Sequence, residues 1–169
     1  MRSIHQISTL IYAFNSSDEV LLLERTRFPN VGLWSPFGGK LETNLGESPH
    51  QSAVRETYEE IGQKFSPSDF HLTGILSERG FDDQAHWLMF LFELKARLTD
   101  LPPAHAEGQY GFFARKSLAD LKLPETDRQF IWPLFWQHRG GFFSARCQTE
   151  PMISWEIEES VPAHSKKAE

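Results

Sequence analysis

Residues 38–63 read GGKLETNLGESPHQSAVRETYEEIGQ and carry the most informative pattern in this sequence. Ser48 is a favourable helix N-cap, because Gln51 three residues later completes a capping box and Pro49 is tolerated in a first turn. Gly62 provides the left-handed residue at which helices commonly end. The stretch therefore predicts a loop that leads into a helix between Ser48 and Gly62.

Three glutamates converge on one face of this predicted helix. Glu56, Glu59 and Glu60 stand at i, i+3 and i+4, which are neighbouring positions on a helix surface. Like charges at these spacings destabilise an exposed helix by roughly 0.2–0.5 kcal/mol per pair, so the clustering needs a cause. A hard divalent cation removes that cost, because carboxylate oxygens are the ligands that Mg2+ and Mn2+ prefer. A solvated acidic helix face is the alternative, and the flanking residues decide between the two.

The whole run resembles the Nudix box, whose pattern is G-x5-E-x7-R-E-U-x-E-E-x-G-U with U a bulky apolar residue. Glu47 and residues 55–62 match it from the second fixed position to the last glycine. The chain departs from the pattern before Glu47, where seven residues rather than five follow Gly39, and at Thr57 and Gln63, which replace apolar residues. No carboxylate is changed by these departures, so we expect metal binding to be retained.

The resemblance implies a Nudix-type α/β/α sandwich, an α/β (α+β) fold with a mixed β-sheet between helices. The order of predicted elements agrees, since strands, one central helix, more strands and a terminal helix follow one another. We expect strands at 4–14, 20–23, 33–37, 70–77, 85–98 and 108–113, and helices at 117–121 and 125–138. Pro133 interrupts the last of these, so that helix begins late, kinks or is split.

The length of 169 residues favours a single domain with a substantial core. We expect residues 1–146 to form one Nudix hydrolase domain. Residues 147–169 mix prolines, charges and one tryptophan without strong periodicity. They are predicted to be a C-terminal appendage that is ordered near 152–157 and disordered at 165–169.

Composition limits the partners of the chain. A net charge of −6 and a pI of about 5.6 argue against a nucleic-acid polymer or an anionic membrane, because phosphate backbones select basic surfaces. A phosphorylated small molecule remains compatible, since a bound metal inverts the local charge. The single cysteine, Cys147, cannot form an internal disulfide, and no signal peptide or apolar run of membrane-spanning length is present. We therefore expect a cytoplasmic protein, either a monomer or a homodimer.

By motif position, the resemblance implies a set of catalytic and metal-binding residues for Mg2+, with Mn2+ as the alternative ion. The candidate metal ligands are Glu56, Glu59, Glu60, Glu107 and the backbone carbonyl of Gly38, and the candidate catalytic residues are Glu47, Glu56, Glu59 and Glu107. Glu107 precedes the last predicted strand, where relatives place a further ligand or general base, and His105 is its alternative. Arg55 is expected to fix the carboxylates, while Gly39 and Gly62 are expected to be structural.

A second set of residues is expected to contact substrate. Arg25 and Arg27 suit phosphate oxygens because a guanidinium presents a fork of donors, and Lys40 follows the glycine pair in the common G-G-K form. The resemblance adds Ser35, Phe37, Thr126 and Asp127 as candidates around the substrate. Candidate base-stacking aromatic residues are Phe28, Trp34 and Phe81.

These features together predict a metal-dependent pyrophosphohydrolase that converts a normal or modified (d)NTP into a nucleoside monophosphate and pyrophosphate. Some relatives that act on oxidised purines carry Asn where this chain has Ser35, and a buried amide reads a purine edge better than a hydroxyl does. Specificity for 8-oxoguanine is therefore not predicted. The alternatives are an ADP-ribose or nucleotide-sugar hydrolase and a nucleotide-sensing Nudix module. The intact glutamates at 56, 59 and 60 favour an enzyme over a sensor.

Overall fold

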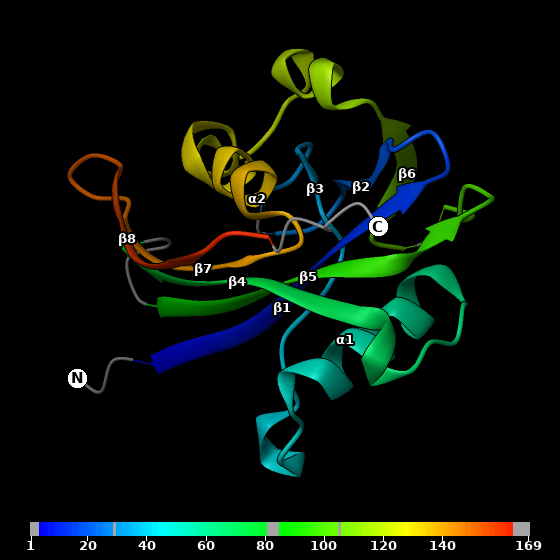
Figure 1. Ribbon diagram of the computed structural model, residues 1–169, viewed down its shortest axis with the longest axis horizontal. Coiled ribbons are helices and arrows are strands. Elements are labelled where there is room, and N and C mark those ends of the chain that lie inside the picture. Colours follow the sequence, from blue (N-terminus) through cyan, green and yellow to red (C-terminus); the bar gives the residue numbers. More distant parts are fainter. Residues whose placement is uncertain (1–3, 29, 81–84, 105, 164–169) are drawn as a thin grey trace, which may run out of the picture.

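The computed structural model describes residues 4–28, 30–80, 85–104 and 106–163 (Figure 1). Its strands and α-helices are β1 (Ile4–Asn15), β2 (Val20–Arg25), β3 (Trp34–Ser35), α1 (Pro49–Ile61), β4 (Phe70–Arg79), β5 (Ala85–Leu98), β6 (Gly108–Phe113), α2 (Trp132–His138), β7 (Phe142–Gln148) and β8 (Ser154–Val161). Short 3-10 turns lie at Thr43–Leu45, Pro67–Asp69 and Arg115–Asp120, and a π-helical turn at Asp127–Ile131 precedes α2.

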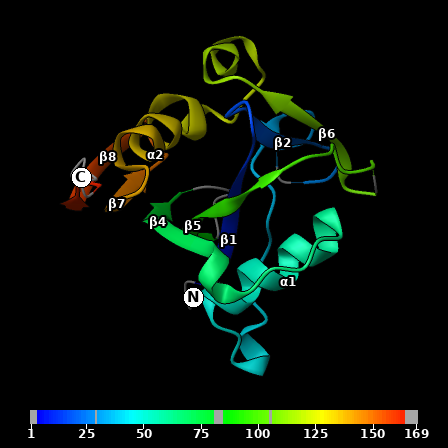
Figure 2. The ribbon, with the colours of Figure 1, turned by 45° about the vertical axis from the view of Figure 1, so that its right-hand side comes forward.

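The strands form one mixed sheet in the order β3-β2-β1-β5-β4-β7-β8, with β6 paired to β2. The β1–β5 and β4–β7 pairs are parallel, and the other pairs are antiparallel. Helix α1 covers one face of the sheet and α2 covers the other, as Figures 1 and 2 show. The predicted sandwich of a mixed sheet between helices is confirmed.

Alternation along the strands separates the core into two layers. On β1, Tyr12 and Phe14 pack with residues of α2, while Ile11 and Ala13 pack with residues of α1. Successive side chains of a strand point to opposite faces, so a strand buried on both faces reads as a continuous apolar run. All four side chains have no exposed surface. The sheet is therefore packed on both faces, with one core layer under α2 and the other under α1.

Helix α1 has the predicted boundaries. The Ser48 hydroxyl accepts a hydrogen bond from the Gln51 N–H at 3.2 Å, and the Ser48 N–H donates to Gln51 Oε1 at 2.9 Å. At the other end, Gly62 has a φ of 71° and donates its N–H to the Tyr58 carbonyl. Both ends are thus fixed by local chemistry, which aligns the glutamates of the last two turns.

The predicted helix at 125–138 is split ahead of Pro133. A π-helical turn spans Asp127–Ile131, in which the Trp132 N–H donates to the Asp127 carbonyl five residues earlier. Helix α2 then begins at Trp132 with proline in its first turn. Proline has no N–H to continue the regular pattern but is tolerated at a helix start, which explains where the break lies. The wide turn places Asp127 over the sheet.

The C-terminal segment continues the sheet. Strand β7 crosses the domain boundary predicted at 146/147, and β8 pairs with it in antiparallel register. The Trp155 ring stacks on Phe130 at 5.3 Å, and His138 Nε2 lies 2.7 Å from the Ser160 hydroxyl. The last strand predicted from sequence was 108–113, so both of these strands were missed. Every residue of β8 is exposed, which removes the apolar alternation that would have predicted it. Residues 165–169 lie outside the described part.

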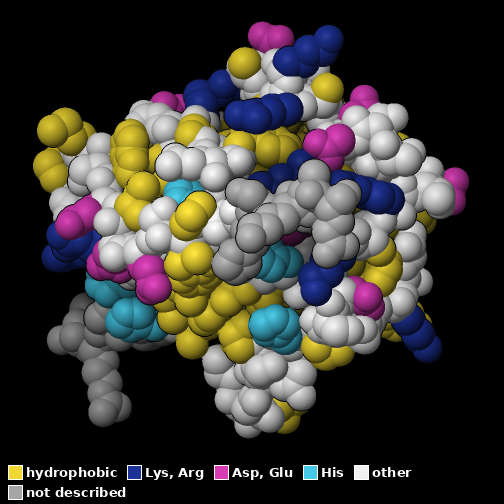
Figure 3. Space-filling model, viewed as in Figure 1, with side chains coloured by type: hydrophobic (Ala, Val, Ile, Leu, Met, Phe, Trp, Pro, Cys, Tyr) yellow, Lys and Arg dark blue, Asp and Glu magenta, His cyan; other side chains and the backbone are white. Residues whose placement is uncertain are grey.

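Charges of both signs are interspersed on the face of the molecule shown in Figure 3. In the described part of the chain, no helix has the length and apolar character that crossing a membrane requires.

Candidate active site

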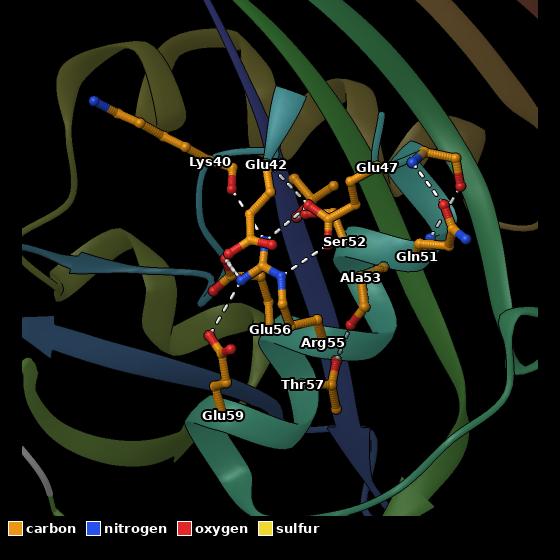
Figure 4. Close-up of polar contacts among 12 residues, drawn as sticks. Lys40, Glu42, Glu47, Gln51, Ser52, Ala53, Arg55, Glu56, Thr57 and Glu59 are labelled. Atoms are coloured by element: carbon orange, nitrogen blue, oxygen red, sulfur yellow. Dashed lines mark hydrogen bonds and ion pairs between the residues drawn. The ribbon is translucent and has the colours of Figure 1, made fainter. Parts of the chain in front are cut away.

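Arg55 is the centre of a network that ties the first part of the box to helix α1 (Figure 4). Its Nε and Nη2 donate to the two carboxylate oxygens of Glu47 at 2.7 and 2.9 Å. Its Nη1 donates to Glu56 Oε1 at 2.7 Å and to Glu59 Oε2 at 3.1 Å. Nη2 also reaches the Lys40 carbonyl at 3.1 Å. One guanidinium therefore fixes three carboxylates and the loop before the helix.

Glu47 binds Arg55 and the loop backbone within this network. Besides its paired contact with Arg55, its Oε2 accepts the Glu42 N–H at 2.8 Å, which closes the enlarged turn before the helix. The Arg55 hydrogen bond is the largest cause of a lowered pKa for the Glu47 carboxyl. A carboxylate held by charge-assisted bonds in this way is a poor proton acceptor. The pairing with Arg55 that sequence suggested for Glu47 is present.

Glu56 lies deeper than its neighbours and has only 7% of its surface exposed. Burial raises the pKa of its carboxyl to about 7, and the bond from Arg55 opposes that shift. Gly39 permits this position, because a Cβ on that residue would lie 2.3 Å from Glu56 Oε1. The glycine is thus required by the close approach of a carboxylate to the loop backbone.

Glu59 and Glu60 differ in their surroundings. The Glu59 side chain is 56% exposed and contacts Arg55. Glu60 accepts a hydrogen bond from the Tyr110 hydroxyl on β6, and that hydroxyl also lies 3.2 Å from the Glu60 backbone carbonyl. Burial, followed by the bond to Glu60, raises the pKa of Tyr110 well above its ordinary value. The two adjacent glutamates therefore point to different partners.

The donor set suits a hard divalent cation, although the side chains are not gathered into a coordination sphere. Glu56, Glu59 and Glu60 offer only carboxylate oxygens, which match Mg2+ and Mn2+ in chemistry. Among the described residues, no group of three His, Cys, Asp or Glu side chains is placed to hold a metal ion. In this structure Arg55 and Tyr110 hold oxygens that a cation would need. A cation bound by these three glutamates would compete with Arg55 and Tyr110 for their carboxylate oxygens.

Glu107 lies beside the start of β6, as the sequence predicted. Its backbone carbonyl accepts the Thr26 N–H at 2.9 Å, and its Oε1 lies 3.8 Å from Arg27 Nη1. Its charge contributes to the raised pKa of Tyr110. Glu107 is therefore near the tyrosine that holds Glu60, whereas its predicted alternative, His105, lies outside the described residues.

A pocket of about 170 Å3 lies on the α2 side of the sheet. This is roughly ten times the 10–15 Å3 that a single water molecule needs, so the space can admit a ring. Its lining residues are Ser8, Thr9, Leu10, Arg25, Asn30, Ser35, Pro36, Gly38, Gly39, Lys40, Glu78, Trp87, Met89, Thr126, Asp127 and Ile131. Both glycines line the pocket, and the Gly39 backbone also lies close against Glu56 of the carboxylate cluster. The pocket and the cluster are therefore joined by one short loop.

Most of the predicted substrate-contacting residues meet in this pocket. Arg25, Ser35, Lys40 and the adjacent Thr126 and Asp127 all line it.

Other predicted contacts lie elsewhere. Phe37 is fully buried in the α1-side core and packs edge-on against Tyr110, which corrects its assignment as a substrate contact. Arg27 is largely exposed beside Glu107. Of the proposed stacking residues, Phe28 is exposed and Trp34 packs on Phe113. Phe81 lies outside the described residues.

A model of the family described as the NUDIX domain matches residues 4–134 of this chain. This range includes the capped helix, the glutamate cluster and the strands that carry them. The chain belongs to the Nudix family. It is accordingly a hydrolase acting on pyrophosphate bonds, and hydrolases of this family generally use divalent metal ions.

Solved structures share this Nudix fold. A MutT protein from Bacillus halodurans is 24% identical with a TM-score of 0.72, covering 90% of this chain and 97% of its own. A MutT protein from Methanosarcina mazei Go1 is 23% identical with a TM-score of 0.67, covering 82% and 99%. The Nudix domain of Shewanella oneidensis NrtR, solved in complex with ADP ribose, is 15% identical with a TM-score of 0.60, covering 78% and 86%. At these identities the likeness shows the fold alone.

Several pocket residues of this Nudix chain were not predicted from sequence, and Glu78 and Trp87 are two of them. Glu78 near the end of β4 and Trp87 on β5 are paired in register and both line the pocket. Glu78 follows Leu76 by two positions and so shares its face of the sheet, toward α2. A charged residue at an inward-facing strand position is the signal that would have found Glu78. Trp87 lay within a long apolar run and read as core.

Proposed function

We propose that this chain is a nucleotide pyrophosphohydrolase that converts a (d)NTP, normal or modified, into a nucleoside monophosphate and pyrophosphate. The observation that carries the proposal is the continuity between the α2-side pocket and the carboxylate cluster through Gly38 and Gly39. A substrate seated in the pocket can extend its phosphates along this loop toward Glu56. The loop is held in place because Arg55 bonds the Lys40 carbonyl.

Positive charge in the pocket supports an anionic substrate. Arg25 and Lys40 line it, and the Lys40 ammonium lies 5.4 Å from the centroid of the Trp87 ring. An arginine fork and a lysine ammonium both suit phosphate oxygens. In the proposed complex these two side chains orient the phosphate chain, while the apolar walls around Trp87 and Met89 bury the rest of the nucleotide.

The reaction is attack of water on one phosphorus, with cleavage of the bridging P–O bond and departure of pyrophosphate. Glu56, Glu59 and Glu60, with the Gly38 carbonyl as a further ligand, would hold a divalent cation, which would neutralise phosphate charge and make a bound water more acidic. Arg55 orients the carboxylates. A carboxylate that does not bind the cation takes the proton, for which Glu107 is the candidate because it is partly exposed. Glu47 remains a support for Arg55.

The test is a substrate screen with the purified protein and one variant. Canonical and oxidised dNTPs, ADP-ribose, nucleotide sugars and dinucleoside polyphosphates are incubated with Mg2+ or Mn2+, and released phosphate and pyrophosphate are measured. We expect dNTPs to give pyrophosphate and Glu59→Gln to lower that release by at least about 100-fold, since it removes a metal-binding oxygen. Glu159→Gln, the same change on the exposed strand β8, is the control and keeps full activity.

Two outcomes would replace the proposal. Turnover of ADP-ribose in preference to dNTPs would assign the chain to the second substrate class, which the fold of the ADP-ribose-bound NrtR domain also accommodates. Tight nucleotide binding without turnover in any metal would identify a sensor. Full activity in Glu59→Gln would show that the metal assignment is wrong.

A further inference from the structure

A pair of buried hydroxyls joins strand β1 to helix α1 behind the loop of Gly38 and Gly39. Thr9 and Ser52 have no exposed surface, and their side-chain oxygens lie 3.2 Å apart. The Thr9 side chain lies on the α1 side of the sheet, since Ile11 two positions later packs in the core layer under α1. The pair is therefore directed toward the helix that carries the box glutamates.

The backbone of Thr9 supports the glycine loop at the same time. Its N–H donates to the Gly39 carbonyl at 2.9 Å. Its carbonyl lies directly against Gly38, where an added Cβ would be 2.1 Å from that oxygen, and Gly38 has a φ of 145°. One residue of β1 thus contacts both glycines through its backbone and α1 through its side chain.

Ser52 connects this support to the carboxylate cluster. Ser52 and Glu56 stand at i and i+4 on α1, which are neighbouring positions on one face of a helix (Figure 4). The Gly39 backbone in turn lies close against the Glu56 carboxylate, because a Cβ there would be 2.3 Å from Oε1. The contacts form a closed ring from Thr9 through Gly39 and Glu56 to Ser52. A shift of α1 along β1 would therefore move Glu56 relative to the loop.

The polar character of this pair needs a reason, because its neighbours are apolar. Ile11 and Ala13 on β1 and Ala53 on α1 belong to the same core layer. Replacing both partners of a buried hydrogen bond by apolar groups of the same shape can leave stability almost unchanged, so packing alone does not require two hydroxyls. A hydrogen bond is directional and holds its two oxygens within a narrow range of distance. The pair can therefore fix how far the helix lies along the strand.

We propose, building on the proposed nucleotide hydrolase function, that Thr9 and Ser52 are positioning residues whose hydrogen bond sets the place of Glu56 beside the Gly39 backbone. The hydroxyls act through Glu56 and do not contact the reacting atoms. Misplacement of a catalytic group by about 1 Å lowers a rate by up to about 100-fold, even when the altered residue is remote from the chemistry. Loss of this bond should accordingly lower turnover and metal affinity and leave substrate affinity nearly unchanged.

The experiment compares Thr9→Val and Ser52→Ala, which remove one hydroxyl each, with Thr9→Ser, which keeps it. Steady-state hydrolysis with Mg2+ gives kcat and KM, and calorimetry without nucleotide gives the affinity for Mg2+. We expect kcat to fall about 5–10-fold and Mg2+ to bind about 3-fold more weakly in Thr9→Val and in Ser52→Ala, with KM within about 2-fold. The double variant should be no slower than about 2-fold below either single variant, because both act through one bond. Thr9→Ser should retain full kcat.

Thr57→Val is the matched control. Thr57 is a fully buried hydroxyl residue next to Glu56 in the sequence, but it donates to the Ala53 carbonyl of its own helix at 2.7 Å. This variant should keep the kcat and the Mg2+ affinity of the unaltered protein. Full kcat or full Mg2+ affinity in Thr9→Val and Ser52→Ala would overturn the inference. Losses as large in Thr9→Ser or Thr57→Val, or losses that multiply in the double variant, would overturn it as well.

The same variants separate this inference from the proposed function. If the unaltered protein hydrolyses ADP-ribose instead of dNTPs, the proposed substrate is wrong, and kcat measured on ADP-ribose decides whether the hydroxyl pair positions Glu56. If no substrate is hydrolysed, the Mg2+ affinities decide alone, and equal affinities in all variants would reject the inference. If Thr9→Val fails to fold, Ser52→Ala gives the same comparison, since alanine is the most favourable residue within a helix.

Discussion

The two faces of the sheet carry two groups of carboxylates that are stabilised in opposite ways. On the α1 side, Arg55 donates to Glu47, Glu56 and Glu59, so a built-in cation neutralises the acids. On the α2 side, Glu78 and Asp127 have no such cation among the described residues, and burial raises the pKa of both to about 7. Arg55 favours the charged form of the first group and opposes the burial that raises the pKa of Glu56 to about 7, whereas the second group has no such opposing cation among the described residues.

This difference indicates what each group can receive. Acids that already pair with an arginine can exchange that cation for a metal ion, because both cations favour the ionised carboxylate. A buried pair that holds a proton can both accept and donate hydrogen bonds, which suits a neutral, polar edge of a ligand. Gly38 and Gly39 lie between the two groups and line the pocket. The contrast therefore predicts different responses to removal of a partner and to pH.

The largest effect should come from Arg55→Ala, which removes the cation from the first group. It leaves Glu47 and the buried Glu56 without their shared donor, and breaking a partly buried ion network in this way costs about 3 kcal/mol of unfolding free energy. Chemical denaturation at neutral pH measures the loss. Metal-stimulated hydrolysis should fall as well, because the loop before α1 loses its bond from Arg55.

Two further variants serve as comparisons for the loss of stability in Arg55→Ala. Arg146→Ala removes an exposed arginine that pairs with Glu156, and such a surface pair contributes only about 0–1 kcal/mol. Arg55→Lys keeps the charge without the fork and should lie between the two. A loss in Arg55→Ala no greater than that in Arg146→Ala would mean that Arg55 does not hold the cluster together.

The α1 side was predictable from sequence, because its determinants are local. The capping box at Ser48, the stop at Gly62 and the spacing of the glutamates all lie within one short stretch, and each acts on its neighbours. The contact of Arg55 with Glu47 also follows from that spacing. Even so, the sequence did not show that Tyr110, fifty residues away, would donate a hydrogen bond to Glu60.

The α2 side was only partly predictable, because its residues meet through the tertiary fold. Asp127 was expected near substrate from the resemblance, whereas Glu78 reached the pocket through the register of β4 with β5. The π-helical turn before Pro133 sets the position of Asp127, and sequence indicated only that the helix would be interrupted there. Strand β8 was missed because both of its faces are exposed, so it has no apolar period.

The stability of the unaltered protein and of Glu78→Gln, compared over a range of pH, tests the raised pKa of Glu78 on the α2 side. The folded pKa of Glu78 is raised from 4.5 to about 7 by burial, so the unfolded chain loses this proton first as pH rises. The stabilising contribution of the protonated group is complete below about pH 4.5 and is lost as pH rises to about 7. Relative to Glu78→Gln, the unaltered protein should therefore lose about 2–3 kcal/mol between pH 5 and 8. Parallel stability curves for the two proteins, measured by denaturation at each pH, would contradict the assignment.

The smallest effect should come from Tyr110→Phe, which probes a third way of holding a carboxylate. Here the phenol hydroxyl of Tyr110 on β6 donates a hydrogen bond to the Glu60 carboxylate on α1, and no cation is involved in this bond. Its removal should cost about 1 kcal/mol of stability, the usual net contribution of one hydrogen bond. Because Glu60 then loses one donor that competes with a cation, we expect Mg2+ to bind a few-fold more tightly, as measured by calorimetry without nucleotide. Weaker Mg2+ binding would instead show that Tyr110 holds Glu60 in its binding orientation, which would make the phenol part of the metal site rather than a competitor for its ligand.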